Sequence, residues 1–218
     1  MTLYLARHGQ TEWNHSARIQ GREDIPLNET GISQAQALGK GLRGLGIERI
    51  WSSPLSRAQD TARTIARACG IERPITLLEG LVERDFGASG GMTVPERAEH
   101  WPDEESVTGQ EPFPVLQARA LAALEHILRI EKSGTVLAVS HGALIDAVIR
   151  HFTKTPFEGI ASIRLRNCSV TRLDAPDLGA ESPTAGFQLV WSNRIAGEFL
   201  LSEEAAARAQ ANIQGVLR

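Results

Sequence analysis

Apolar residues along the chain form short continuous runs that alternate with longer stretches of helical spacing. Each short run predicts a buried strand, and these runs fall at residues 3–6, 49–53, 75–78 and 135–140. The last of them is almost continuously apolar, which is typical of the centre of a parallel sheet. Apolar side chains recurring every three or four residues predict amphipathic helices at residues 30–46, 54–70, 114–131 and 141–152.

Helix and loop boundaries follow from glycine, proline and polar clusters. Pro54 suits a helix start, and Gly46 and Gly70 suit helix ends. The segments at 9–29 and 79–112 lack a clean period and predict loops, with one short helix at 95–101 in the second. A terminal pair of strands is expected at 161–174 and 187–193, joined by a polar turn at 175–186, and a surface helix from Ser202 onward.

Alternating strands and helices predict an α/β protein. We expect a three-layer sandwich: a mostly parallel central sheet flanked by helices, with one antiparallel edge strand. We expect a single domain over residues 1–218, with a small cap or insertion around 84–112. Sheets of this kind bind ligands beyond the carboxyl ends of their strands, so chemistry should gather there.

Composition narrows the functional classes. The 218 residues are 42% hydrophobic and 22% charged, with a net charge of -3, so no nucleic-acid partner is expected. Two distant cysteines, Cys69 and Cys168, are not a disulfide framework and suit two small buried side chains in a reducing compartment. With no signal peptide expected before Arg7 and no long apolar run, a cytoplasmic protein without membrane association is the default expectation.

Polar residues of a particular kind follow four of the predicted strands. They are Arg7 and His8, then Arg57, then Glu83, then His141. A single polar side chain at a strand end is most simply solvated. Five together, all of types that serve phosphoryl chemistry, favour an active site.

Phosphoryl transfer gives a physical reason for these residue types. The transferred group carries negative charge, which arginine forks and helix N-termini can bind. A neutral imidazole can attack phosphorus, and neighbouring arginines disfavour its protonated form. A carboxylic acid can protonate the leaving alcohol. Two arginines and a second imidazole could supply the positive charge, so no metal or other cofactor is expected.

The sequence resembles the histidine phosphatase superfamily, also called the phosphoglycerate mutase-like family. The resemblance rests on five stretches in the family's order and spacing, and they span about two-thirds of the chain. These stretches are LARHGQTEWN at 5–14, IQGREDIPLNETG at 19–31, SSPLSRAQDTA at 52–62, LVERDFG at 81–87 and VSHG at 139–142.

The resemblance implies a role for each matching residue. His8 would be the nucleophile that becomes phosphohistidine, and Glu83 the proton donor that later activates water. The phosphoryl oxygens would be bound by Arg7, Arg57 and His141. The resemblance adds further phosphate- or substrate-binding positions, namely Asn14, Gln20, Gly21 and Gly142.

Two of these assignments have rivals in the sequence. Arg57 could instead lie on a helix surface and pair with Asp60. For the acid, only the L-x-E-x-x-F-G register selects Glu83 over Glu79, Asp85 and Glu96. Phe86, Met92 and Trp101 could contact an apolar leaving group or simply pack in the core.

Three functions remain open within the family. A phosphatase for small phosphomonoesters is favoured, a cofactor-dependent phosphoglycerate mutase is the alternative, and a non-catalytic phosphate-binding module is third. Glu83-Arg84 resembles the mutase version, but the mutase lysine and paired arginines are missing and the mutase asparagine is Ala143 here. The expected partner is a small phosphomonoester. The terminal strand pair is compatible with a homodimer or with simple closure of the sheet.

Overall fold

The computed structural model describes residues 1–103, 106–175, 187–196 and 198. Within them the strands form one six-stranded sheet in the order β3-β2-β4-β1-β5-β6. The strands are β1 (Thr2–Arg7), β2 (Ile47–Ser52), β3 (Thr76–Leu77), β4 (Thr135–Ser140), β5 (Val170–Asp174) and β6 (Gln188–Arg194). The β1–β4, β2–β4 and β2–β3 pairs are parallel, and β5 runs antiparallel to both of its neighbours. The predicted α/β class with a mostly parallel sheet is confirmed, and the antiparallel pairings are confined to the β5–β6 end.

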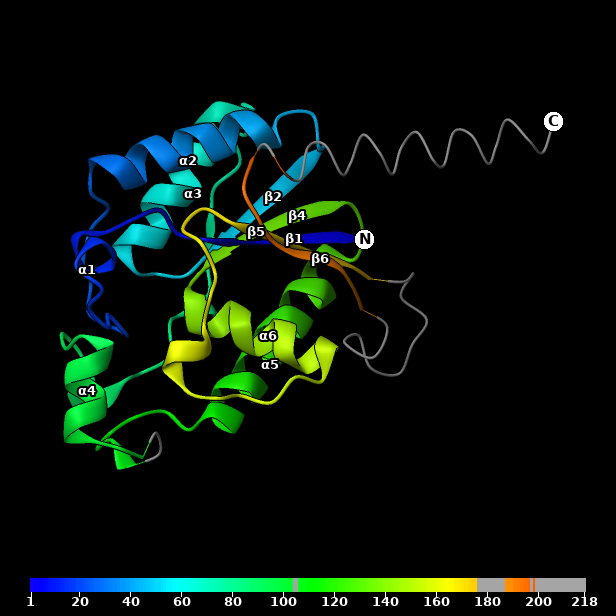
Figure 1. Ribbon diagram of the computed structural model, residues 1–218. Coiled ribbons are helices and arrows are strands. Elements are labelled where there is room, and N and C mark those ends of the chain that lie inside the picture. Colours follow the sequence, from blue (N-terminus) through cyan, green and yellow to red (C-terminus); the bar gives the residue numbers. More distant parts are fainter. Residues whose placement is uncertain (104–105, 176–186, 197, 199–218) are drawn as a thin grey trace.

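Helices cover both faces of the sheet, as Figure 1 shows. On one face lie α2 (Glu29–Leu42) and α3 (Ser56–Cys69), and on the other α5 (Phe113–Glu131) and α6 (Gly142–Thr153). Two short helices, α1 (Glu12–His15) and α4 (Val94–His100), lie at the end of the molecule where β1 and β4 finish. Three short 3₁₀ turns complete the described elements: η1 (Glu79–Leu81), η2 (Gly87–Ser89) and η4 (Ile160–Ser162).

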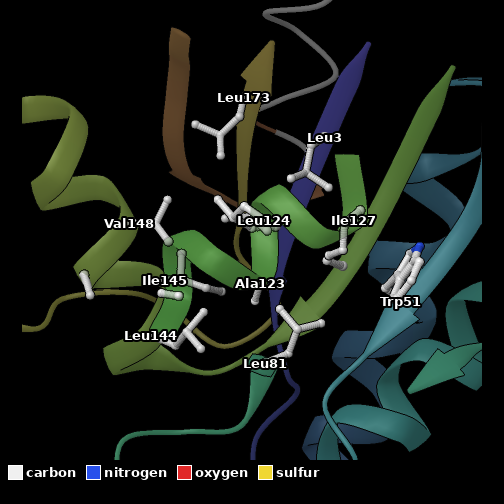
Figure 2. Close-up of a cluster of buried hydrophobic side chains, with 14 of the residues drawn as sticks. Leu3, Trp51, Leu81, Ala123, Leu124, Ile127, Leu144, Ile145, Val148 and Leu173 are labelled. Atoms are coloured by element: carbon white, nitrogen blue, oxygen red, sulfur yellow. The ribbon is translucent and has the colours of Figure 1, made fainter. Parts of the chain in front are cut away.

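The inner residues of the two central strands, 3–6 of β1 and 136–139 of β4, are apolar because both faces of these strands are buried. Leu3 and Leu5 of β1 belong to a cluster with α5 and α6, whereas Tyr4 and Ala6 belong to a second cluster with α2 and α3. Figure 2 shows the first cluster, in which Leu124 and Ile127 of α5 lie among side chains of the sheet. The period-2 alternation of side chains divides one continuous apolar run between two cores.

Most predicted elements lie within a few residues of their predicted positions, and the exceptions have local causes. The helix predicted to end at Gly46 ends at Leu42, because Arg43 leaves the helical conformation and Gly44 has a φ of +84°. The strand predicted over 161–174 is formed only at its end, because Cys168 has a φ of +54° and its N–H turns toward the backbone of Arg7 and His8. The loop predicted over 9–29 contains α1, which Thr11 caps.

Two predicted segments lie outside the described residues: the polar turn after residue 175 and the helix from Ser202. Both cysteines are free, and Cys168 is buried. No helix in the described ranges is long and apolar enough to cross a membrane.

Candidate active site

The central parallel pair of strands sets the positions of the two predicted site histidines. In the β1–β4 register Arg7 stands beside Ser140, so the next residues, His8 and His141, leave the sheet side by side. Their ring centroids lie 5.1 Å apart. The structure therefore brings two residues that are far apart in the sequence to the carboxyl end of the sheet, where the fold class predicts a ligand site.

The His8 ring has a defined tautomer. Its Nδ1 lies 2.7 Å from the carbonyl oxygen of Gly9, which can only accept a hydrogen bond, so Nδ1 carries the hydrogen. Nε2 then holds the free electron pair, toward which Arg57 Nε donates at 3.3 Å. Burial, and then the positive charges of Arg57 and Arg7, hold the pKa of His8 well below its usual 6.5. The ring is therefore neutral and basic at Nε2.

Two buried guanidinium groups flank this ring. Arg57 donates to the carbonyl oxygens of Gly21 at 2.8 Å and Glu23 at 2.7 Å, which fixes its fork against the first loop. Burial lowers the pKa of Arg57 to about 10, so it remains a cation near neutral pH. Its rival partner Asp60 pairs with Arg63 instead, at 2.8 Å.

Arg7 presents a donor that the described residues leave unused. One guanidinium nitrogen donates to the carbonyl oxygen of Leu165, but the buried Nε has no hydrogen-bond partner in the described part of the chain. A buried cationic N–H without an acceptor is costly, so this position favours an anionic oxygen.

His141 lies behind His8 and is fully buried. Its Nε2 is 2.8 Å from Ser53 Oγ, and its Nδ1 has no partner within the described residues. Burial, followed by the charge of Arg57, lowers the pKa of His141 well below 6.5. Sequence reasoning did not single out Ser53, because only the β2–β4 pairing brings it to His141.

Glu83 occupies the N-terminus of α6. Its carboxylate accepts from the backbone N–H groups of Ala143 at 3.1 and 3.2 Å and Leu144 at 3.2 Å. The end of a helix supplies such donors, because its first N–H groups have no partner within the helix, and here they hold the Glu83 carboxyl group in place. The rival carboxylates Glu79, Asp85 and Glu96 do not line the pocket described next.

A pocket of about 150 Å³ opens where these groups meet. Eight of the nine predicted site residues line it, and His141 does not, because it lies behind the His8 ring. The eight are Arg7, His8, Asn14, Gln20, Gly21, Arg57, Glu83 and Gly142. Phe86, which the sequence offers as a contact for an apolar leaving group, also lines the pocket, whereas Met92 and Trp101 do not. Five further residues complete the wall and were not predicted as site residues: Arg18, Ile19, Ala143, Ile160 and Ile163.

The first loop reaches the pocket through a hydrogen-bonded framework. Gln20 Oε1 accepts from the Thr11 hydroxyl at 2.9 Å, and Asn14 Oδ1 accepts from Asn167 Nδ2 at 3.0 Å. Asn167 also donates to the backbone oxygen of His8 at 3.1 Å. Nothing in the sequence near Asn167 predicts this role, because the contact spans more than 150 residues.

The arrangement of potential metal ligands can be compared with what a metal ion needs. No group of three or more His, Cys, Asp or Glu side chains in the described ranges is arranged to hold a metal ion. The positive charge at the pocket comes from arginines and a helix N-terminus.

Comparison with known proteins places this site in a family. Residues 3–182 match the model of the histidine phosphatase superfamily (branch 1). A curated relative from Salmonella paratyphi B, named probable phosphoglycerate mutase GpmB, is 36% identical over 184 residues, covering 80% of this chain and 85% of the relative.

Solved structures of similar fold carry phosphatase names. A phosphoserine phosphatase from Entamoeba histolytica has a TM-score of 0.74 and 28% identity, covering 88% of this chain and 96% of its own. A mycobacterial glucosyl-3-phosphoglycerate phosphatase has a TM-score of 0.73 and 27% identity, covering 88% of this chain and 99% of its own. This chain belongs to the histidine phosphatase superfamily, as an enzyme of branch 1.

Proposed function

We propose that the protein hydrolyses small phosphomonoesters through a phosphohistidine formed on His8, without a metal ion. The observation that carries this proposal is the His8 ring, which is neutral, has its free electron pair at Nε2 and lies among buried cations. Such a ring is a nucleophile held where a phosphoryl group would be bound.

The reaction takes two steps. His8 Nε2 attacks phosphorus, the ester P–O bond breaks, and the leaving alkoxide takes a proton from the carboxylic acid form of Glu83. A water molecule then attacks the phosphohistidine, gives its proton to Glu83, and the P–N bond breaks to release inorganic phosphate. Arg7 and Arg57 bind the phosphoryl oxygens throughout, and Arg7 Nε is the donor without a partner that suits this role.

Two observations favour hydrolysis over transfer to a second hydroxyl. Arg84, which resembles the mutase pattern, does not line the pocket: its guanidinium lies over the rings of Phe86 and Phe157 at 5.4 and 5.2 Å. Ala143 lines the pocket at the position where the mutase pattern has asparagine. The solved neighbours named as phosphatases support the same choice.

Phosphoglycerate mutase activity stays the second candidate, because the curated relatives are named probable phosphoglycerate mutases. Phosphorus NMR with 3-phosphoglycerate and a trace of 2,3-bisphosphoglycerate separates the two. We expect inorganic phosphate alone, and growth of 2-phosphoglycerate would establish the mutase. If neither appears, p-nitrophenyl phosphate tests for a phosphatase of other specificity, and H8A is the inactive control in both assays.

A further inference from the structure

The segment that carries Glu83 lies outside the sheet. It connects η1 to η2 over residues 82–86, and none of these residues belongs to a strand. Residues 82–84 of this segment, and Leu81 before it, are nevertheless buried, so their backbone carbonyl groups need hydrogen-bond donors. Ser140 at the end of β4 donates its hydroxyl to the carbonyl oxygen of Leu81 at 2.7 Å, and a side chain of α5 supplies donors to the carbonyl groups on either side of it.

That side chain is Arg119. Its Nη1 donates to the carbonyl oxygens of Gly80 at 3.0 Å and Val82 at 2.8 Å, and its Nη2 donates to the carbonyl oxygen of Glu83 at 3.3 Å. One planar group thus contacts the backbone at Glu83 and at two positions before it. Arg119 is absent from the pocket wall, and its hydrogen bond to Glu83 goes to the backbone oxygen.

Glu111 holds the other edge of the same guanidinium group. Arg119 Nε and Nη2 donate to its two carboxylate oxygens, each at 2.8 Å, which is a bidentate pair of fixed geometry. The exposed fraction of the Glu111 side chain is 9% and that of Arg119 is 21%. Burial alone would raise the pKa of Glu111, but the hydrogen bonds and charge of Arg119, together with the Asp85 N–H and the charge of Arg22, lower that pKa below its usual value.

Glu111 also fixes the chain on the other side of Glu83. Its backbone N–H donates to the carbonyl oxygen of Asp85 at 2.8 Å, and its carbonyl oxygen accepts from Arg84 Nε at 2.8 Å. The backbone at Glu83 is therefore held from before by Arg119 and from after by Glu111. We call these two residues the clamp.

We propose that the clamp is a positioning device for the proton-transfer step, with Arg119 setting where the Glu83 carboxyl stands relative to the leaving oxygen. This inference rests on the proposed function of Glu83. Proton transfer requires the acid to lie within hydrogen-bond reach of the oxygen, and a displacement of about 1 Å can cost up to a hundredfold in rate. A clamp that only joined α5 to the loop would affect unfolding and leave the proton transfer unchanged.

The choice of substrate distinguishes these two roles. p-Nitrophenyl phosphate has a leaving group that needs little protonation, whereas glycerol 2-phosphate needs a proton from Glu83. R119K keeps the charge but cannot form the planar fork, and E111Q keeps the volume but loses the bidentate charge pair. R129Q is the matched control on α5, because Arg129 is exposed and forms a surface ion pair with Glu125 at 3.7 Å.

We expect R119K to lower kcat for glycerol 2-phosphate by about tenfold to a hundredfold more than kcat for p-nitrophenyl phosphate, with KM little changed. E111Q should shift the ratio in the same direction, and R129Q should leave it unchanged.

A double-mutant cycle completes the test. In an E83Q background R119K should cause no further loss on glycerol 2-phosphate, because the clamp acts through Glu83.

Equal losses on both substrates in R119K and E111Q, or a full additional loss in the E83Q background, would overturn the inference. Circular dichroism and thermal unfolding confirm that each variant is folded at the assay temperature, and if R119K is unfolded, E111Q carries the cycle. The same measurements distinguish failure of the proposed function from failure of this inference. In that case the wild-type protein hydrolyses neither ester, or E83Q itself does not change the ratio.

Discussion

His8 and His141 are buried as neutral imidazoles next to arginines, and this makes the free energy of unfolding depend on pH. In the unfolded chain a histidine has a pKa of about 6.5, whereas burial and then neighbouring charge hold the pKa values of His8 and His141 well below it. Between the folded and unfolded pKa values the unfolded chain binds more protons. The free energy of unfolding is therefore highest above pH 6.5 and falls as the pH drops below it.

We expect the free energy of unfolding to fall by up to about 1.4 kcal/mol per pH unit for each of these two histidines. Urea unfolding at pH 7.5, 6.5 and 5.5 measures this slope. The double variant H8N/H141N should have a flatter profile, whereas H100N, at an exposed position in α4, should keep the wild-type slope. An unchanged slope in the double variant would show that other groups dominate acid sensitivity.

Glu83 carries the second residue-level prediction. E83Q should reduce hydrolysis of glycerol 2-phosphate by at least about tenfold more than hydrolysis of p-nitrophenyl phosphate, because only the first leaving group needs a proton. E79Q is the matched control, since Glu79 lies close in sequence and is absent from the pocket wall. Steady-state kinetics with both esters would decide the matter, and parallel losses in E83Q would remove Glu83 as the acid.

Residue types and family register were enough to predict side chains that line the pocket, but not the residues that contact them from outside it. His8, Arg57 and Glu83 all line the pocket as their positions after strands predict. Asn167 and Arg119 were not predicted, because their contacts are long-range. In the sequence, Arg119 is one polar position on a predicted amphipathic helix, and nothing local distinguishes it from Arg129.

At the scale of elements, the start of α2 is pressed against the loop that follows His8. A Cβ added to Gly31 would lie 2.1 Å from the carbonyl oxygen of Gln10, and one added to Gly9 would lie 2.5 Å from that of Gly31. These are backbone atoms, so neither side can yield without moving the helix or the loop. The contact fixes the end of the loop next to His8.

G31A should therefore lower the free energy of unfolding by about 1–3 kcal/mol and reduce activity through the displaced loop. Thermal unfolding together with p-nitrophenyl phosphate hydrolysis measures both effects. G90A is the control: Gly90 is exposed, and an added Cβ would meet only the Gly87 carbonyl oxygen at an ordinary 3.5 Å. Wild-type stability in G31A would show that the contact relaxes freely.

Element positions were predicted better than element ends. Apolar periodicity locates α5 and β4 closely, because burial on a sheet face dictates both patterns. The early end of α2 and the short β5 depend on single residues with positive φ, Gly44 and Cys168. A cysteine in that conformation has no sequence signature, so the shortening of β5 could not be predicted.

At the scale of the whole molecule, positive charge is concentrated at the pocket although the net charge of the chain is negative. The chain has a net charge of -3, yet Arg7 and Arg57 converge with the N-terminus of α6 on one small pocket. If these groups suffice to bind the phosphoryl oxygens, activity should persist undiminished in excess EDTA. A loss of activity that added divalent metal restores would contradict the metal-free proposal, and dialysis followed by metal analysis would identify the ion.

The pairing of β1 with β4 has a consequence for the folding of the chain. His8 and His141 are neighbours only because Thr2 to Arg7 stand in register with Thr135 to Ser140, across some 130 residues of intervening chain. A slip of one residue would turn each side chain to the opposite face of the sheet. Enzymatic turnover regained during refolding therefore reports that this long-range strand pairing has formed, and it should lag behind the recovery of helical signal. The recovery of activity thus measures when the two central strands have paired in the native register.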